Sequence, residues 1–285
     1  MPNAAPSAVA GRGVNLDLPN VARVYDFLLG GTAYWSRDRS FGLRILHEFP
    51  EFRDIARAHR VFVNRVVRQL VRLGVRQFLD IGSGVLSTGN THQIADEIAP
   101  CRVVYVDNEP VTAAQTELAL DDDGDPRRHA VVDVDLRDPA AVWAGALATG
   151  VLDPQEPVAV LMFSVLQFFP PGLDDEASRA VAHYRELVPT GSYLGVSHVT
   201  DDGIPDAVTP KLAKLKQLCE SWYHTAFHCR SRAAIRALLG DFELLAPGMV
   251  WVPQWHPEDH AGPLEAISFS TPNHSMVWAG VGRKR

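Results

Sequence analysis

An aspartate just before a glycine turn is the feature of this sequence with the clearest chemical meaning. Residues 78–84 read FLDIGSG, in which apolar residues flank Asp80 and the turn follows directly. The apolar residues are typical of a short buried strand, and the glycines permit backbone angles that a Cβ would forbid. In an open α/β sheet, a turn at the carboxyl end of a strand lets the main chain approach a ligand. We therefore predict a ligand site at Asp80, Gly82, Ser83 and Gly84.

The charge of Asp80 narrows the choice of ligand. Gly82 and Gly84 begin a G-x-G-x-x-G dinucleotide fingerprint, but the next required position holds Ser87, so the fingerprint fails. A pyrophosphate would also meet like charge at Asp80, at roughly 4 kcal/mol for two charges about 4 Å apart in an effective dielectric of about 20. S-adenosylmethionine (SAM) carries a sulfonium and an ammonium and no phosphate, so the same carboxylate favours it. The competing interpretation is that Asp80 only ties the glycine loop through backbone N–H groups.

Alternating strands and helices are expected to hold this turn. The pattern predicts strands at 76–81, 102–107, 130–134, 158–164 and 193–198, and helices at 90–100, 110–120, 139–148 and 174–188. This alternation indicates a doubly wound, mostly parallel sheet. The last third of the chain predicts helices at 206–222 and 231–239 and strands at 242–249 and 275–282. The acidic run 121–123 is expected to form the turn after the second of the four helices.

The N-terminal part predicts added helices. We expect residues 1–15 to be disordered because they are rich in Ala, Pro, Gly and Ser. Residues 16–75 are expected to form a helical lid, and residues 76–285 the ligand-binding core, as one structural domain with the lid. The lid helices are predicted at 20–30, with Asn20 and Gly30 as caps, at 38–48 and at 51–73.

Charge argues against a nucleic-acid partner. The net charge is −7 and the isoelectric point is near 5.9. The arginines of the third predicted helix include Arg57, Arg60, Arg65, Arg68 and Arg72. Phe62 is the one aromatic residue among them and the net charge is acidic, so a solvated helix face is favoured over a nucleic-acid stripe.

Cysteine usage and hydropathy predict a reduced, cytoplasmic protein without membrane contact. The three cysteines include no C-x-x-C pair, and no apolar run reaches about 18 residues. His224, His228 and Cys229 lie close in sequence, as do His256 and His260, but H-E-x-x-H is absent. We therefore expect no metal site.

Several motifs in order resemble the actinobacterial S-adenosyl methyltransferase family, long catalogued as a domain of unknown function. They are VARVYDFLLGG at 21–31, RQFLDIGSG at 76–84, GNTH at 89–92, VVYVDNEP at 103–110, VVDVDLRDP at 131–139, GSYLGVSH at 191–198 and GVGRK at 280–284. The likeness spans roughly residues 18–284, with departures at 85–87 and 32–37. It implies a class I methyltransferase fold, a Rossmann-like sheet of seven strands in the order 3-2-1-4-5-7-6 with strand seven antiparallel. The two late strands supply strands six and seven.

The strand ends then supply candidate cofactor residues. Asp107 ends the second strand, where an acid accepts hydrogen bonds from ribose hydroxyls, and Asn108 is expected to share this contact. Asp135 and the N–H of Leu136, after the third strand, are expected to contact the adenine. Asp133 competes with Asp135 for this role because the end of the strand is uncertain by a few residues.

The remaining candidates rest on strand position or on the resemblance. Ser164 ends the fourth strand beside the glycine turn and is expected to reach the methionine part of SAM. The family motif implies cofactor-binding roles for Tyr25, Asp26 and His92, with a core aromatic and a helix-start residue as the alternatives for Tyr25 and His92. His198, at the end of the fifth strand, is the candidate general base, and a structural histidine is the alternative.

These features predict a SAM-dependent methyltransferase that produces S-adenosylhomocysteine and acts on an unidentified small-molecule acceptor. The N-terminal helices and the loops at 32–37, 200–230 and 250–273 are expected to cover the site. The aromatic residues expected to line the acceptor pocket are Tyr34, Trp35, Trp222, Tyr223, Trp251 and Trp255, with packing of the added helices as the alternative. A SAM-binding sensor or interaction module without catalysis is the alternative function, and a nicotinamide oxidoreductase is disfavoured by the glycine spacing. Both a monomer and a homodimer remain open.

Overall fold

The computed structural model describes residues 18–87, 89–172, 175–223, 227–259, 267 and 269–285, with the side chains of 222 and 223 excepted. Residues 1–15, expected to be disordered, lie outside this part. The helices are α1 Val21–Leu29, α2 Ser36–Glu48, α3 Phe52–Arg72, α4 Thr91–Asp96, α5 Pro110–Asp123, α6 Pro139–Ala148, α7 Glu176–Leu187, α8 Thr209–Tyr223 and α9 Arg232–Leu238. Short 3-10 turns are η2 Leu166–Phe168, η3 Val252–Gln254 and η4 Pro272–Ser275. The strands are β1 Gln77–Ile81, β2 Arg102–Asp107, β3 His129–Asp133, β4 Ala159–Phe163, β5 Tyr193–Val199, β6 Glu243–Leu244, β7 Val250–Trp251 and β8 Val277–Arg283.

The strands form one eight-stranded sheet in the order β3-β2-β1-β4-β5-β8-β6, and β7 also pairs with β8. Strands β1 to β5 pair with one another in parallel, and β8 runs antiparallel to β5, β6 and β7. This is the predicted order, with β8 in the place of the antiparallel seventh strand, so the predicted fold class is confirmed. The carboxyl ends of β1, β2, β3 and β4 therefore meet at one edge of the sheet.

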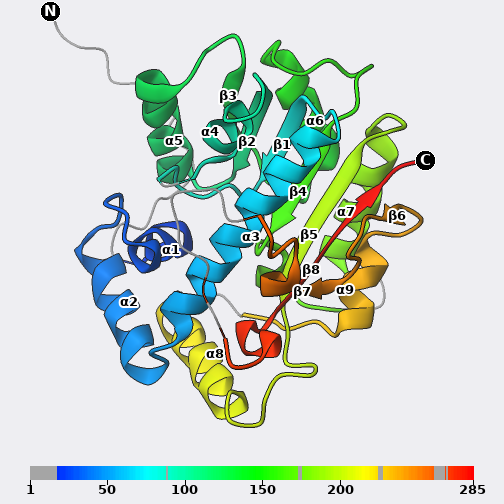
Figure 1. Cartoon of the computed structure of the whole chain (residues 1–285). Coiled ribbons are helices and arrows are strands. Elements are labelled where there is room, and N and C mark those ends of the chain that lie inside the picture. Colours follow the sequence, from blue (N-terminus) through cyan, green and yellow to red (C-terminus); the bar gives the residue numbers. More distant parts are fainter. Residues whose placement is uncertain (1–17, 88, 173–174, 224–226, 260–266, 268) are drawn as a thin grey trace, which may run out of the picture.

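Two layers of helices cover the sheet (Figure 1). Val104 and Val160 of the sheet pack with α6, α7 and α9 on one face, and Phe78 and Leu161 pack with α1, α2, α3 and α8 on the other. Helix α3 contributes apolar residues along its whole length to the second face. The added helices are thus part of one continuous core with the sheet.

Two of the differences from the predicted boundaries have a visible physical reason. The strand expected at 242–249 is reduced to β6, and the separate strand β7 begins just beyond that range. Pro247 has no N–H to donate, and the Gly248 N–H turns back to the Leu245 oxygen at 2.7 Å. The acidic run 121–123, expected to form a turn, is the last turn of α5, which ends only at Gly124. The Asp123 carboxylate is held there by the side chain of Gln93.

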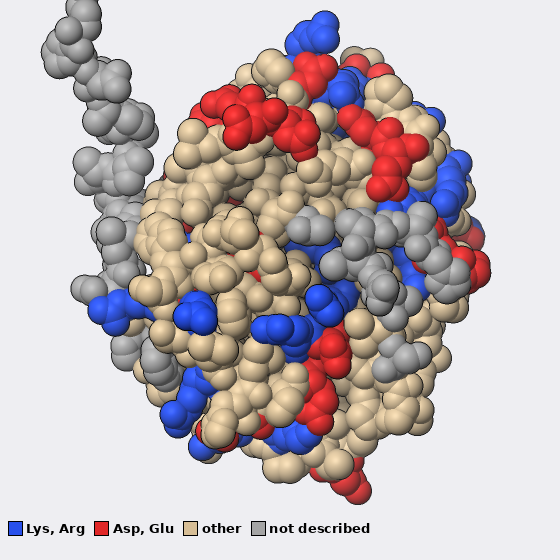
Figure 2. Space-filling model, turned by 60° about the vertical axis from the view of Figure 1, so that its left-hand side comes forward, with Lys and Arg blue, Asp and Glu red and all other residues tan. Residues whose placement is uncertain are grey.

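Two of the α3 arginines do not lie on the solvated face that was expected for them. Arg65 is buried and donates to the main-chain oxygens of Trp255, Pro257 and Asp259. Arg68 is 1% exposed and pairs with Glu97 at 2.9 Å. That interpretation is therefore wrong at both positions, because α3 is covered by the C-terminal segment instead of by solvent. On the face shown in Figure 2, basic side chains are scattered, and acidic ones gather mainly at the upper end.

Candidate cofactor site

A cavity of about 800 Å³ lies at the carboxyl edge of the sheet, under the N-terminal helices. Its volume is within the range of roughly 300–1,000 Å³ that is usual for small-molecule sites. The sheet side is lined by the ends of β1, β2 and β4 and the segment after β3, and the opposite side by α1, α2, α3 and α8. The lining includes these predicted cofactor residues: Tyr25, Asp26, Asp80, Gly82, Ser83, Gly84, Asp107, Asn108, Asp135, Leu136 and Ser164.

The glycine turn has the backbone shape expected from its sequence. Gly82 and Gly84 have φ values of +70° and +65°, in the left-handed region that favours glycine. A Cβ on Gly82 would lie 2.4 Å from Cγ2 of Val165, so the turn is also closely packed. The N–H of Gly82 donates to the Val106 oxygen at 2.8 Å, which extends the β1–β2 pairing into the turn. The turn is thus held in a fixed position against the cavity.

Replacing Gly84 by alanine is expected to lower the free energy of unfolding by about 1–2 kcal/mol. The left-handed conformation costs an alanine roughly this amount, and the new Cβ would lie 3.3 Å from Cβ of Ala22. Urea unfolding of the Gly84→Ala variant measures the change. Gly172→Ala is the matched control, because Gly172 has ordinary backbone angles and only a 3.6 Å contact. Equal stability of the two variants would contradict the prediction.

Asp107 connects the glycine turn to the end of β2. Its carboxylate accepts a hydrogen bond from the N–H of Gly84 and another from the N–H of Glu109, both at 3.0 Å. Burial raises the pKa of Asp107 to about 6, and these two N–H groups oppose that rise. The carboxylate is therefore mainly ionised at neutral pH and available to accept further hydrogen bonds from a ligand.

This raised pKa predicts a pH dependence of cofactor binding. In the predicted complex a ribose hydroxyl would donate to the ionised carboxylate. Protonation of Asp107 would then remove the acceptor, and binding is expected to weaken as the pH falls through about 6. Calorimetry is expected to show roughly tenfold weaker SAM binding at pH 5 than at pH 7. Asp107→Asn should bind weakly with little pH dependence over this range. Equal wild-type affinity at both pH values would rule out this role for Asp107.

Asp80 lies at the end of β1 with its side chain at the cavity. Thr91 donates its hydroxyl to the carboxylate at 2.6 Å, and burial raises the pKa of Asp80. Among the described residues, no backbone N–H donates to this carboxylate. The interpretation that Asp80 only ties the glycine loop through backbone N–H groups is therefore wrong in this structure.

Arg60 of α3 is a cavity residue that the sequence analysis did not select. Its guanidinium carbon lies 5.5 Å from the ring centroid of Tyr25, and its charge opposes the rise in the pKa of Asp80. No carboxylate of the described residues lies within 4.0 Å of its guanidinium, and its Nε is buried without a partner. The cavity thus holds a guanidinium and a carboxylate near each other without a direct ion pair.

His59 of α3 is a second cavity residue that was not predicted from the sequence. Its ring contacts side chains from α1, from β5 and from the segment after β4. Its Nδ1 lies 3.0 Å from the Tyr25 hydroxyl, and its Nε2 lies 2.8 Å from Oγ of Ser197 and 3.0 Å from Oγ of Ser164. Burial, with the nearby charge of Arg60, lowers the pKa of His59 to about 3, so the ring is neutral. Ser164 has φ +53°, an unusual backbone angle for a serine, and the hydrogen bond to His59 holds it there.

Asp135 follows β3 and is fixed by its neighbours. Arg137 donates to its two oxygens at 3.0 and 2.6 Å, and Asn108 donates to it at 3.0 Å. The hydrogen bond from Arg137 is the main cause that lowers the pKa of Asp135 to about 2. Asp133 ends β3, is exposed, and is not part of the cavity lining. The geometry therefore favours Asp135 over Asp133 as the acid that faces a ligand.

A family model described as S-adenosyl methyltransferase matches residues 7–285. The chain belongs to the S-adenosyl methyltransferase family. Two crystal structures are similar over nearly the whole chain, and no curated protein matches the sequence. One, from Thermobifida fusca, is described as a candidate methyltransferase, with 30% identity and a TM-score of 0.81 over 98% of this chain and 100% of that one. The other is a DUF574 family protein from Streptomyces avermitilis, with 30% identity and a TM-score of 0.82 over 94% and 98% of the two chains.

A more distant structure supports the fold. The magnesium protoporphyrin IX methyltransferase of Synechocystis, with bound S-adenosylhomocysteine, is 18% identical, with a TM-score of 0.51 over 92% of this chain and 98% of that one. Family and fold together identify a SAM-dependent methyltransferase, so the predicted family and enzyme class are confirmed.

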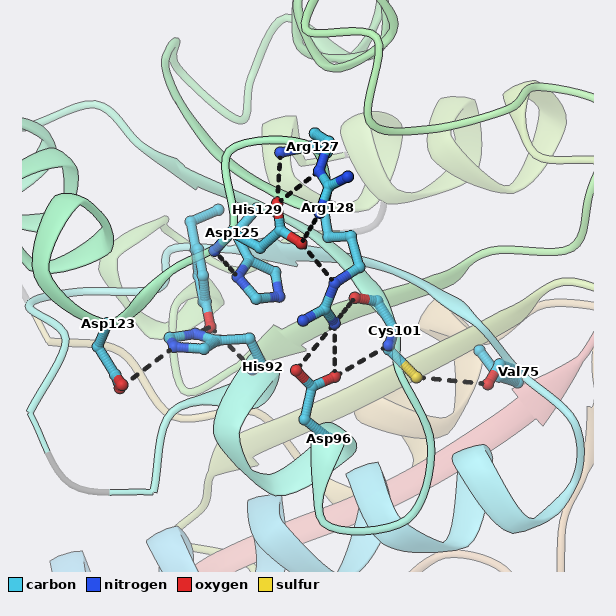
Figure 3. A network of polar contacts seen from close by, with 10 residues as sticks. Val75, His92, Asp96, Cys101, Asp123, Asp125, Arg127, Arg128 and His129 are labelled. Carbon is cyan, nitrogen blue, oxygen red and sulfur yellow. Dashed lines mark hydrogen bonds and ion pairs between the residues drawn. The ribbon is translucent and has the colours of Figure 1, made fainter.

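Two residues expected to act in this S-adenosyl methyltransferase do not line the cavity. His92, the second residue of α4, is buried in a polar cluster. There its Nδ1 contacts the Tyr105 hydroxyl at 2.7 Å and its ring lies 4.6 Å from that of His129 (Figure 3). His198 is fully buried and donates from Nδ1 to the Val199 oxygen at 2.7 Å. Burial lowers the pKa of each to about 4. We therefore assign neither residue to the proposed site, and we do not assign His198 as the general base.

The aromatic residues expected to line an acceptor pocket mostly pack elsewhere. Tyr34 contacts Phe27, and the Arg23 guanidinium lies over Trp35 at 4.0 Å. Trp251 stacks on Trp278 at 3.9 Å, and Trp255 is fully buried against Phe62. The expectation is wrong for Tyr34, Trp35, Trp251 and Trp255, whereas the side chains of Trp222 and Tyr223 lie outside the described residues.

The N-terminal helices do cover the cavity, and a buried ion pair holds them together. Arg23 of α1 donates to Asp38 of α2 at 2.8 Å, and the same carboxylate accepts from the N–H groups of Asn20 and Trp35. Of the predicted covering loops, 32–37 and the described part of 250–273 do not line the cavity, while Phe227 from 200–230 does.

No metal ligands or membrane spans are found in the part of the chain that the structure describes. No group of three or more His, Cys, Asp or Glu side chains could hold a metal ion there. His224 and His260, considered as metal ligands above, lie outside that part. No described helix combines the length and the apolar character that crossing a membrane requires.

Proposed function

We propose that the cavity binds SAM in a defined orientation and that the protein transfers the methyl group to a small-molecule acceptor. The observation that carries this proposal is the convergence of the glycine turn, Asp80 and Asp107 on one cavity. In this arrangement Asp107, with Asn108 beside it, accepts hydrogen bonds from the ribose hydroxyls. Asp135 and the N–H of Leu136 contact the adenine.

The methionine part of SAM is a zwitterion, and the cavity offers a complementary pair of charges. The ammonium lies at Asp80 and the carboxylate at Arg60, with Ser164, Tyr25 and His59 forming the wall beside them. A guanidinium can bind a carboxylate through two parallel hydrogen bonds. Because the sulfonium already activates the methyl group, the protein has to hold the acceptor in line with it and exclude water.

Calorimetry and turnover test the proposal together. The protein is expected to bind SAM and S-adenosylhomocysteine and not NAD, and to transfer label from methyl-labelled SAM to a small molecule in a cell extract. NAD binding without a response to SAM would overturn the cofactor assignment. Binding of SAM with no labelled product would instead favour the alternative, a SAM-binding module without catalysis.

The choice between Asp135 and Asp133 has its own test. Asp135→Ala is expected to weaken SAM binding about tenfold, because it removes one hydrogen bond from the adenine amino group to a charged acceptor, worth roughly 1.5 kcal/mol. Asp133→Ala is the matched control and is expected to bind SAM as the wild type does. Calorimetry on both folded variants gives the comparison, and the reverse ranking would reassign the contact to Asp133.

A further inference from the structure

Three arginines form a row on one side of α3 without acidic partners. Arg53, Arg57 and Arg60 are spaced i, i+4 and i+7, so their side chains are neighbours on the helix surface. No carboxylate of the described residues lies within 4.0 Å of any of the three guanidinium groups. By contrast, Arg68 of the same helix pairs with Glu97. The row is therefore a source of positive charge that the described part of the protein does not neutralise.

The donor groups of Arg53 and Arg57 are accessible from outside. Both residues are half-buried, and only their Nε atoms are shielded from solvent. Their terminal nitrogens keep exposed surface and donate to no group of the described residues. The guanidinium carbon of Arg53 lies 5.6 Å from the ring centroid of Phe27, which holds that side chain against α1. Because the groups are partly shielded from water, an anion at their terminal nitrogens is attracted more strongly than at a fully exposed arginine.

The row runs beside the cavity. Phe52, Ala56 and Arg60 line the cavity from successive turns of α3, and Arg53 and Arg57 directly follow the first two in the sequence. At a rise of about 1.5 Å per residue, Arg53 and Arg57 lie about 6 Å apart along the helix axis, and Arg57 lies about 4.5 Å from Arg60. Arg60 is already assigned to the carboxylate of the cofactor. Arg53 and Arg57 are thus left for a second anion, just outside the cavity.

The cavity itself favours an apolar group beside the cofactor. Its lining includes the half-buried rings of Phe52, Phe168 and Phe227, which offer apolar surface for a ligand to cover. The described lining holds no unpaired cation besides Arg60. An anionic group buried there would lack a counter-ion, which is strongly unfavourable. An acceptor with both an apolar body and an anionic group would therefore place the anion at the row of arginines.

We propose that Arg53 and Arg57 bind a phosphate group of the methyl acceptor, and that the acceptor is a small molecule with an apolar body and a phosphate. This inference rests on the proposed function, because it describes the acceptor of the same cavity. The body lies in the cavity and the phosphate stays outside it. The three terminal oxygens of a phosphate can engage the forked donors of two guanidinium groups, whereas a carboxylate fills only one fork. The net charge of −7 disfavours a nucleic acid as the source of the phosphate.

Three probes test this assignment by calorimetry on the complex with S-adenosylhomocysteine. 2-Naphthyl phosphate has an apolar body and a phosphate, 2-naphthol has the same body without the phosphate, and inorganic phosphate has no body. Wild-type protein is expected to bind 2-naphthyl phosphate at least about tenfold more tightly than either of the other two. One hydrogen-bonded contact to a charged group contributes about this factor.

Variants of the row complete the test. In the double variant Arg53→Met with Arg57→Met, the preference for 2-naphthyl phosphate over 2-naphthol is expected to disappear. The affinities for 2-naphthol and for S-adenosylhomocysteine are expected to be kept, which also shows that the variant is folded. The control is Arg283→Met, which should keep the preference. Arg283 is exposed and lies over Tyr193 at the start of β5, at the opposite edge of the sheet from the cavity.

The possible outcomes separate this inference from the proposed function. The assignment falls if the wild-type complex shows no preference for 2-naphthyl phosphate over 2-naphthol, if the preference survives in the double variant, or if Arg283→Met loses it as well. Inorganic phosphate that binds as tightly as 2-naphthyl phosphate would assign the arginines to free phosphate and overturn the proposal for the acceptor. Failure of wild-type protein to bind S-adenosylhomocysteine would be a separate result, and it would remove the proposed function and this inference with it.

Discussion

Asp107→Ala is expected to weaken SAM binding by about 100-fold or more. Hydrogen bonds to a charged group contribute roughly 1.5–3 kcal/mol each, and the two ribose hydroxyls can both donate to this carboxylate. At 1.4 kcal/mol per factor of ten, the loss of both gives at least this change. The variant also loses the acceptor for the N–H groups of Gly84 and Glu109, so the glycine turn is held less firmly.

Calorimetry with SAM, after circular dichroism has shown that the variant is folded, measures the effect of Asp107→Ala. Asp121→Ala is the matched control, since Asp121 is an exposed acid on α5 that does not line the cavity. A folded Asp107→Ala protein that binds SAM within about threefold of the Asp121→Ala control would show that the ribose lies elsewhere.

Arg60→Met is expected to weaken SAM binding by a similar factor, about 100-fold. Methionine keeps much of the apolar stem of the side chain but cannot form the two charge-assisted hydrogen bonds to the carboxylate of the cofactor. 5′-Methylthioadenosine has the adenine, ribose and sulfur of SAM but neither carboxylate nor ammonium. Its affinity is therefore expected to stay within about twofold of the wild-type value in the same variant.

Comparing SAM with 5′-methylthioadenosine makes the prediction for Arg60→Met specific to the carboxylate contact. A general disturbance of the cavity would weaken both ligands, whereas loss of the carboxylate contact weakens SAM alone. Arg57→Met, three residues earlier on α3 and outside the cavity lining, serves as the control for removing a charge from this helix. Equal losses for SAM and 5′-methylthioadenosine in Arg60→Met would refute the assignment of Arg60.

The sequence was sufficient to place Asp107 and Ser164 on the sheet side of the cavity. Parallel strands end at a common edge, so locating the end of β2 and of β4 was enough to bring Asp107 and Ser164 to the glycine turn. The N-terminal helix was also predictable, because Asn20 caps it by accepting from the N–H of Arg23 and Gly30 ends it in a left-handed conformation.

The residues on the helical side could not be found in this way. The arginines of α3 look alike in sequence. Only the packing of the helix between the sheet and the C-terminal segment places Arg60 at the cavity and Arg65 at the oxygens of Trp255 and Asp259. The prediction that the aromatic residues line an acceptor pocket failed because large apolar side chains pack between helices as readily as they line ligand sites.

The position of β8 in the sheet has a consequence for how the protein is made. β8 pairs with β5, β6 and β7, all of which leave the ribosome before it. Val277 follows Val199 by 78 residues. At a translation rate of about 5–20 residues per second, β8 is therefore synthesised roughly 4–16 s after β5. All seven residues of β5 are buried in the finished sheet, and an unpaired strand edge of this kind is a template for other chains. The nascent chain must therefore keep this edge from aggregating until its last strand is translated.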